Sequence, residues 1–315
     1  MVAILVADVG GTQLRVAAFQ RDSIEPIKHK IAPTKSPGSS TFERFTALIE
    51  SAWPDETVEA ISVAAPGPLD TETGVILSAP NIPEWMNFPL GERLAERFGV
   101  PVFIGNDANL ALLGEWRYGA GQGHHDLVYI TISTGIGGGV ISRDQLLLGH
   151  HGLAAELGHI TVLPGGPLCS CGQRGHLEAI SSGPAIARYV NEKLAEGEAS
   201  ILKTSDDLSA REVAKAARRG DPLAKAAYTR AGEYLGQALA DFLHIFNPSI
   251  VIFGGGVSRS GSLIFDPLKD ALYKHVMDAD YVKELVMTSA RLGDNAGLIG
   301  AKVQAELKLS SIHKE

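Results

Sequence analysis

The chain has 315 residues, enough for one large domain or two medium ones that each bury a core. Hydrophobic residues make up 45% and charged residues 20%, as in ordinary globular proteins. The formal net charge of −8 gives no general attraction to nucleic acid or to an anionic membrane, so we expect neither as a partner.

The first apolar run, residues 2–7, is short and ends at Asp8, so it is predicted to be a buried strand and not a signal peptide. No apolar stretch approaches the roughly 18 residues that a membrane span requires. The only cysteines, Cys169 and Cys171, are separated by one residue and make a poor structural disulfide. A reducing compartment is therefore favoured, and we expect a cytoplasmic protein.

Strand-like and helix-like segments alternate along the chain, which predicts an α/β fold. Strands are expected at residues 3–7, 16–19, 60–65, 102–105, 127–133, 139–142 and 250–254. Helices are expected at residues 41–53, 90–98, 107–118, 183–195, 221–246 and 295–308. The longest helix is the best defined, because Asp221 can cap it and Pro222 suits its first turn.

An internal duplication is indicated by two similar segments. Residues 4–19 consist of a strand, a Gly/Thr turn at residues 8–12 and a second strand, and residues 127–142 repeat this scheme. We expect a ligand between two lobes. One lobe would comprise residues 1–116 with a C-terminal helix at about 298–315, and the other would comprise residues 117–297.

The glycine turns are suited to binding phosphate, because glycine lets several main-chain amides approach an anion and threonine adds a hydroxyl donor. Taken singly, each turn could be only a tight hairpin. A third glycine run, Gly254-Gly255-Gly256, follows a predicted strand, where a nucleotide base and ribose could pack. Neither a Walker A motif nor a dinucleotide-binding fingerprint is present.

Several motifs occur in a characteristic order along the chain. They are Asp8-Val9-Gly10-Gly11-Thr12, Ala65-Pro66-Gly67-Pro68, Pro80-Asn81-Ile82-Pro83-Glu84-Trp85, Asn106-Asp107-Ala108-Asn109, Thr134-Gly135, Glu156-Leu157-Gly158-His159 and Gly254-Gly255-Gly256. From residue 5 to about residue 301 the chain resembles the ROK family (repressors, open reading frames, kinases), and within it the bacterial glucokinases. The resemblance implies a two-lobed actin/Hsp70/hexokinase-like (ribonuclease H-like) fold with an interlobe cleft.

The resemblance also implies an ATP-dependent hexose kinase, with glucose as the first sugar to consider. Its nucleotide site would use Asp8, through hydrated Mg²⁺, together with Gly10, Gly11, Thr12, Thr134, Gly135, Gly255 and Gly256. Its sugar site would use Gly67, Asn81, Asn106, Asp107, Glu156, His159 and Glu178. Asp107 would be the catalytic base that takes the proton of the sugar hydroxyl. Taken alone, Asp107 could instead cap a helix, and the two glutamates could be surface carboxylates.

A structural zinc site is predicted from His159, Cys169, Cys171 and His176, since two thiolates and two imidazoles satisfy tetrahedral Zn²⁺. In the family pattern a third cysteine is usual where this chain has His176. The histidine preserves a ligand but changes the geometry. The alternatives are a metal-free turn and a simple pair of reactive thiols.

Other functions stay open at this point. A DNA-binding repressor would carry a helix-turn-helix ahead of the first phosphate motif, which begins here at Asp8. A non-catalytic sugar sensor, or a kinase for fructose, mannose, allose or N-acetylmannosamine, would share most of the pocket residues. Polyphosphate is an alternative donor, but a neutral, glycine-rich donor site without a basic track favours ATP. A homodimer or higher homo-oligomer is the family expectation.

Overall fold

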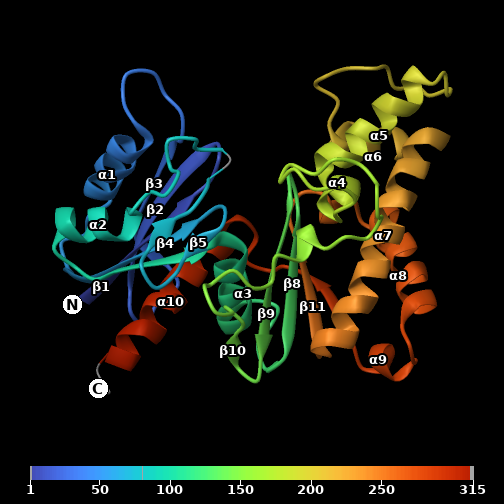
Figure 1. Ribbon diagram of the computed structural model, residues 1–315. Coiled ribbons are helices and arrows are strands. Elements are labelled where there is room, and N and C mark those ends of the chain that lie inside the picture. The colour runs from blue at the N-terminus through green and yellow to red at the C-terminus, as the bar shows by residue number, and fades with distance from the viewer. Residues whose placement is uncertain (1, 80, 313–315) are drawn as a thin grey trace. The chain divides into compact units, whose positions relative to one another are not determined.

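Figure 1 shows the computed structural model, which describes residues 2–79 and 81–312. The chain divides into two compact units. The first contains residues 1–123, 146–154 and 291–315, and the second contains residues 124–145 and 155–290. Each unit is built on its own five-stranded sheet.

The sheet of the first unit has the strand order β3-β2-β1-β4-β7. Its strands are β1 (Val2–Val9), β2 (Gln13–Gln20), β3 (Pro26–Pro33), β4 (Thr57–Ala65) and β7 (Val102–Asn106). β1 pairs antiparallel with β2 and parallel with β4, while β4 and β7 are also parallel. The central strands are buried along nearly their whole length, as expected for strands covered on both faces.

Helices cover this sheet. They are α1 (Thr41–Ser51), α2 (Leu90–Phe98), α3 (Asp107–Tyr118) and α10 (Ala296–Ile312), and β5 (Leu69–Asp70) and β6 (Val75–Ile76) form a small ribbon. Alternate residues of β1, such as Leu5 and Ala7, share a core with Phe45 of α1 and Leu94 of α2. Because successive strand residues point to opposite faces, Asp8 belongs to the other face, where α10 packs against β1.

The sheet of the second unit has the order β10-β9-β8-β11-β12. Its strands are β8 (Leu127–Ile132), β9 (Ile136–Ser142), β10 (Gln145–Leu146), β11 (Ile250–Gly254) and β12 (Val286–Ser289). β8 pairs antiparallel with β9 and parallel with β11. Both sheets therefore contain an antiparallel hairpin followed by parallel strands, in the same order, as the predicted duplication requires.

The helices of the second unit are α4 (Glu178–Ser181), α5 (Gly183–Ala195), α6 (Ala210–Arg218), α7 (Pro222–Phe246), α8 (Ser262–His275) and α9 (Asp280–Lys283). Figure 1 shows α7 and α8 running side by side. Gly232 and Gly236 of α7 permit this approach, because a Cβ on either would lie within 2.7 Å of a main-chain oxygen of α8. One core joins α7 to β8 and β11.

Every strand and helix predicted from the sequence has a counterpart, and the α/β fold class is confirmed. The sequence prediction missed β3, α6, α8 and β12 among the longer elements. The predicted lobe boundary between residues 116 and 117 lies inside the last turn of α3, and the division into lobes at this point stays a prediction. Among the described residues, none of the helices combines the length and apolarity needed to cross a bilayer.

Candidate active site

The first glycine turn joins β1 to β2 in the first unit. The Gly10 N–H donates to the Gln13 carbonyl at 2.9 Å and closes the hairpin. Thr34 fixes the turn from the far end of β3, because its hydroxyl donates to the Gly10 carbonyl at 2.6 Å and its N–H donates to the Thr12 carbonyl at 2.9 Å. The sequence analysis missed Thr34, since this contact depends on β3. The turn is thus closed by its own main chain and joined to the residue that follows β3.

Asp8 lies at the end of β1 beside this turn. Burial raises the pKa of Asp8 above the ordinary aspartate value, and the Arg15 guanidinium, 3.9 Å away, opposes that rise. A Cβ placed on Gly297, in the first turn of α10, would lie 3.3 Å from the Asp8 carboxyl carbon, so α10 begins against this carboxylate. Asp8 is therefore a desolvated carboxylate with a guanidinium at ion-pair distance, and its role in binding Mg²⁺ stays a prediction.

Asn81, a predicted sugar residue, lies directly against the first glycine turn. A Cβ on Gly11 would lie 2.8 Å from the Asn81 Cβ, so only glycine fits there. The structure therefore brings together one predicted nucleotide residue and one predicted sugar residue within the first unit. Pro80, which precedes Asn81 in the quoted motif, lies outside the described residues.

Gly67 has a left-handed backbone, with a φ of 83°. A Cβ at this position would lie 1.8 Å from the Ser78 carbonyl oxygen. The turn at Gly67 is consequently pressed against the segment that leads to Asn81. Any side chain at position 67 would displace that segment.

Asn106 and Asp107 form the junction between β7 and α3. Asn106 is the N-cap of α3, because its Oδ1 accepts the N–H groups of Ala108 at 3.0 Å and Asn109 at 3.2 Å. Asp107 is the first residue of the helix, and its Oδ1 accepts the Ala108 N–H at 2.8 Å. The capping role that the sequence left open for Asp107 thus belongs to Asn106. A carboxylate in the first turn also benefits from the positive end of the helix dipole.

The second unit contains a cavity of about 820 Å³ beside the second glycine turn. Thr134 and Gly256, two of the predicted nucleotide residues, line it. Gly255 instead shapes the wall: its φ is 85°, and a Cβ there would lie 2.2 Å from the Ile132 carbonyl oxygen. The remaining lining residues are Ser133, Gly183, Pro184, Asp206, Leu208, Ser209, Ala210, Arg211, Ala214, Arg218, Tyr228, Val257, Arg259 and Ser260.

Three arginines lie in this lining, in contrast to the neutral donor site expected from the sequence. Arg211 and Arg218 lie on α6, and Arg259 follows β11. Two of them were overlooked because α6 was not predicted. The signal was present, however: Ser209 and Glu212 form a capping box at the start of α6, and that serine–glutamate spacing is visible in the sequence.

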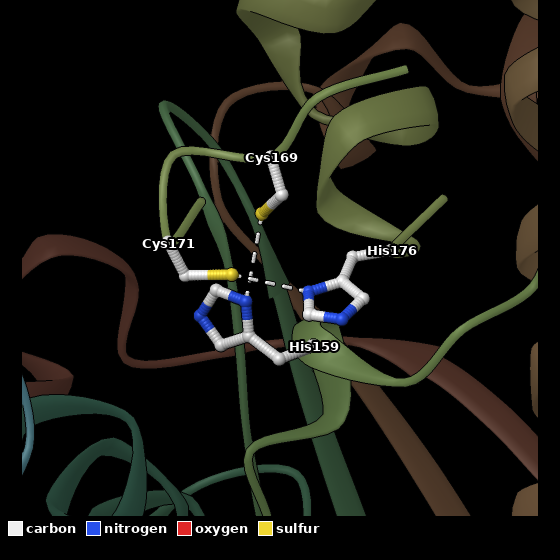
Figure 2. A group of neighbouring side chains, drawn as sticks. All are labelled: His159, Cys169, Cys171 and His176. Carbon is white, nitrogen blue, oxygen red and sulfur yellow. Dashed lines mark hydrogen bonds between the residues drawn. The ribbon is translucent and has the colours of Figure 1, made fainter. Parts of the chain in front are cut away.

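The predicted zinc ligands converge on a single point in the second unit (Figure 2). The ligand atoms of His159, Cys169, Cys171 and His176 all lie within 4.8 Å of one another. Nδ1 of His159 is 3.6 Å from Sγ of Cys169, and Nδ1 of His176 is 3.2 Å from Sγ of Cys171. Tetrahedral zinc, with bonds of about 2.3 Å to sulfur and about 2.0 Å to nitrogen, separates such atoms by about 3.6 Å. The donor set and its spacing therefore fit zinc, with His176 as the fourth ligand.

Two predicted sugar residues flank this cluster. Glu156 immediately precedes a short 3₁₀ turn (Leu157–His159), and its carbonyl accepts the His159 N–H at 3.0 Å. The pKa of Glu156 is raised above the ordinary glutamate value, mainly because the side chain is buried. The electrostatic interaction with His159 opposes this rise, and the interaction with the Glu178 carboxylate adds to it. Glu178 is the first residue of α4, and its Oε2 accepts the Ile136 N–H at 3.0 Å. A Cβ on Gly135 would lie 2.5 Å from the same oxygen.

The predicted residues are divided between the two units. The first unit carries the whole of the first glycine turn, Asp8, Gly67, Asn81, Asn106 and Asp107. The second unit carries Thr134, Gly135, Gly255, Gly256, Glu156, Glu178 and the four cluster residues. Within each unit the predicted residues lie in turns or near the ends of strands and helices.

Paired sheets of equal order, each opening with a glycine hairpin, define an actin-like α/β fold. The sequence pattern of the ROK family matches residues 4–307, and the chain belongs to this family. It is 37% identical over 304 residues to a glucokinase of Thermotoga maritima, covering 95% of both chains.

Two solved structures of ROK proteins are also similar to this chain over nearly its whole length. A ROK hexokinase from Thermus thermophilus aligns with a TM-score of 0.84 and 35% identity, covering 98% of this chain and 99% of the other. A ROK family glucokinase from Streptomyces griseus, solved in complex with glucose and AMPPNP, aligns with a TM-score of 0.81 and 35% identity, covering 97% and 99% of the two chains.

Proposed function

We propose that this chain is an ATP-dependent hexose kinase that converts glucose to glucose 6-phosphate. The observation that carries the proposal is the likeness to the S. griseus glucokinase, a structure that contains glucose and an ATP analogue, over 97% of this chain. The position of Asp107 supports it, because Asn106 caps α3 and Asp107 adds a carboxylate beside that cap.

In the proposed mechanism Asp107 accepts the proton of the sugar's primary hydroxyl while that oxygen attacks the γ-phosphorus of ATP. The new O–P bond forms as the bond to ADP breaks, so catalysis consists mainly of positioning and charge neutralisation. Main-chain amides of Gly11 and Thr12 hold phosphate oxygens, Gly10 closes the turn that presents them, and Thr134 and Gly135 hold phosphate oxygens from the second unit. Mg²⁺ near Asp8 would neutralise phosphate charge when bound.

The sugar ring would be held by groups that both donate and accept hydrogen bonds. We assign this role to Gly67, Asn81, Asn106, Glu156, His159 and Glu178. Since the Asn106 oxygen already accepts two amides of α3, its side chain would serve the sugar through its Nδ2 donor. The adenosine would occupy the cavity lined by Thr134 and Gly256, with Gly255 shaping its wall.

We further propose a cytoplasmic homodimer or higher homo-oligomer that binds no nucleic acid.

We also propose a structural Zn²⁺ held by His159, Cys169, Cys171 and His176. Zinc content of the purified protein, before and after chelation, tests the metal assignment. A His176→Cys variant should retain zinc because cysteine is also a ligand, whereas Cys171→Ser should lose it.

The activity is tested by a coupled ADP-release assay with Mg·ATP and glucose, fructose, mannose, allose or N-acetylmannosamine. We expect the highest kcat/KM with glucose. A preference for another hexose would correct the substrate and leave the reaction class intact. Activity with polyphosphate in place of ATP would change the donor, and the arginines of the cavity make that control necessary. No turnover with any of these sugars would contradict the proposal.

A further inference from the structure

The carboxylate of Glu178 joins two segments that are distant in the sequence. Its Oε1 accepts the Ser170 hydroxyl at 2.7 Å and lies 3.6 Å from the Cys169 thiol. Its other oxygen, Oε2, accepts the Ile136 N–H at 3.0 Å. One side chain therefore connects the loop of the metal cluster to the first residue of β9.

Ser170 occupies a special place in that loop, between the two thiols of the cluster. The loop is closed by its own main chain, with the Cys169 N–H donating to the Gln173 carbonyl at 2.8 Å and the Gly172 N–H donating to the Cys169 carbonyl at 3.0 Å. A metal that bound both thiolates would fix the backbone on either side of Ser170. The Ser170 side chain would then start from a fixed backbone position, within hydrogen-bond reach of Oε1 of Glu178.

The other end of the connection is the second glycine turn. Gly135 packs against Oε2 of Glu178, and its carbonyl accepts the Ser133 N–H at 2.8 Å. The Ser133 carbonyl in turn accepts the Gly183 N–H at 2.8 Å. Ser133, Thr134 and Gly183 all line the 820 Å³ cavity, so the Glu178 carboxylate supports one wall of that cavity from behind.

We infer that Ser170 is a positioning residue, which holds Glu178 so that the metal loop and the nucleotide turn are coupled. The hydroxyl supplies a charge-assisted hydrogen bond to Oε1, and this leaves Oε2 directed at the Ile136 N–H. Metal bound by the loop therefore favours the ordered form of the turn. By linkage, a nucleotide bound at the turn strengthens metal binding by the same factor. The nucleotide and the bound metal both rest on the proposed function, whereas the connection from Ser170 through Glu178 to Ile136 does not.

The coupling is tested first on the ligand-free, full-length protein by amide hydrogen exchange at Ile136. Ser170→Ala removes the hydroxyl and leaves all four cluster ligands, so its zinc content should equal that of the wild type. We expect exchange at Ile136 to be several-fold faster in this variant and in chelated wild-type protein. Ser170→Thr keeps a hydroxyl and should restore slow exchange. Equal exchange rates in Ser170→Ala and the wild type would overturn the inference.

A second readout is the Kd for AMPPNP without sugar. Loss of one hydrogen bond worth about 1 kcal/mol weakens binding about fivefold, and we expect a change of this order in Ser170→Ala. Chelation should weaken binding in the wild type but add little in Ser170→Ala, because the connection is already broken. A full additional effect of chelation in that variant would contradict the coupling. If wild-type protein bound no AMPPNP while Ile136 responded as expected, the proposed function would fail and the coupling would stand.

Discussion

Asn106 and Asp107 are neighbours at the start of α3, but they use their side chains differently. The Asn106 Oδ1 accepts two helix amides, at 3.0 Å and 3.2 Å, whereas the Asp107 Oδ1 accepts the N–H of the next residue, Ala108, at 2.8 Å. Asn106 therefore caps the helix, and Asp107 places a carboxylate in the first turn. This separation makes the proposed base testable by substitution.

We expect Asp107→Asn to lower kcat by about 10²- to 10⁴-fold, because an amide cannot take a proton from the sugar hydroxyl. Its melting temperature should match the wild type, since the amide oxygen can still accept the Ala108 N–H. Asn106→Ala is the matched control, and loss of the N-cap should lower its stability by about 1 kcal/mol. Steady-state kinetics and thermal unfolding distinguish the two. Near-normal kcat in Asp107→Asn would remove Asp107 from the mechanism.

A second prediction concerns Asp8 and pH. The pKa of Asp8 is raised in the folded protein by burial, so ionising it costs folding free energy. This cost is absent below the unfolded value, about 3.9, and grows as the pH rises through the folded pKa. Asp8→Asn removes the cost. We therefore expect Asp8→Asn to be more stable than the wild type at neutral pH, with the difference shrinking as the pH falls towards 4.

The measurement is the melting temperature of both proteins across this pH range without nucleotide. Adding Mg·ATP tests the role of Asp8 in binding the metal. If Asp8 supports the metal, Mg·ATP should raise the melting temperature of the wild type more than that of Asp8→Asn. A stability difference that did not change with pH would show that ionisation of Asp8 is not its cause.

The sequence allowed the prediction of elements whose signals are local. α7 begins at Asp221 and Pro222 as expected, and the two glycine turns are the hairpins that their residues indicated. β3 was missed because it is a largely exposed strand at the sheet edge, so its residues lack the alternating apolar pattern of a half-buried strand. α6 was missed although its capping box could have revealed it.

The contacts that organise the site could not be read from the sequence, because they join distant residues. Glu178 was predicted as a sugar residue, but its hydrogen bond to Ile136 spans 42 positions. The hydroxyl of Thr34 reaches Gly10 across 24 positions. Such pairs arise only once the sheets are formed. Motifs therefore indicated candidate residues without showing which of them support one another.

A third prediction separates backbone strain from steric conflict at glycine. Gly67 and Gly99 both have a positive φ, 83° and 68°, but a Cβ on Gly67 would lie 1.8 Å from the Ser78 oxygen while one on Gly99 meets no atom within 4 Å. Gly99→Ala should lower stability by about 1 kcal/mol through strain alone. Gly67→Ala should lower it by a further 2 kcal/mol or more, roughly, because the segment before Asn81 must move.

Urea unfolding of both variants provides the comparison. KM for glucose should rise in Gly67→Ala and stay unchanged in Gly99→Ala, since only the first lies beside a proposed sugar residue. Equal losses of stability in the two variants would mean that the turn at Gly67 relaxes freely, and Asn81 would then not depend on it.

The fourth prediction concerns Glu115 of α3, a fully buried carboxylate. Its Oε2 accepts the N–H groups of Ala120 at 2.8 Å and Arg291 at 3.1 Å, and its Oε1 accepts the Leu292 N–H at 2.7 Å. These amides belong to the segment that follows α3 and the segment that precedes α10. Residues 120 and 291–292 all belong to the first unit, so Glu115 joins two of its segments that are far apart in the sequence.

Glu115→Ala would leave three main-chain donors without this acceptor, and we expect it to lower the free energy of unfolding by about 3 kcal/mol or more. Glu115→Gln should be intermediate, because one oxygen can still accept while the amide nitrogen faces donors. Glu96→Gln, on an exposed position of α2, is the matched control and should change stability by less than about 0.5 kcal/mol. If Glu115→Gln behaved like Glu96→Gln in urea unfolding, water would have to satisfy the three amides as well as the carboxylate does. In that case neither the segment after α3 nor the segment before α10 would depend on the Glu115 carboxylate.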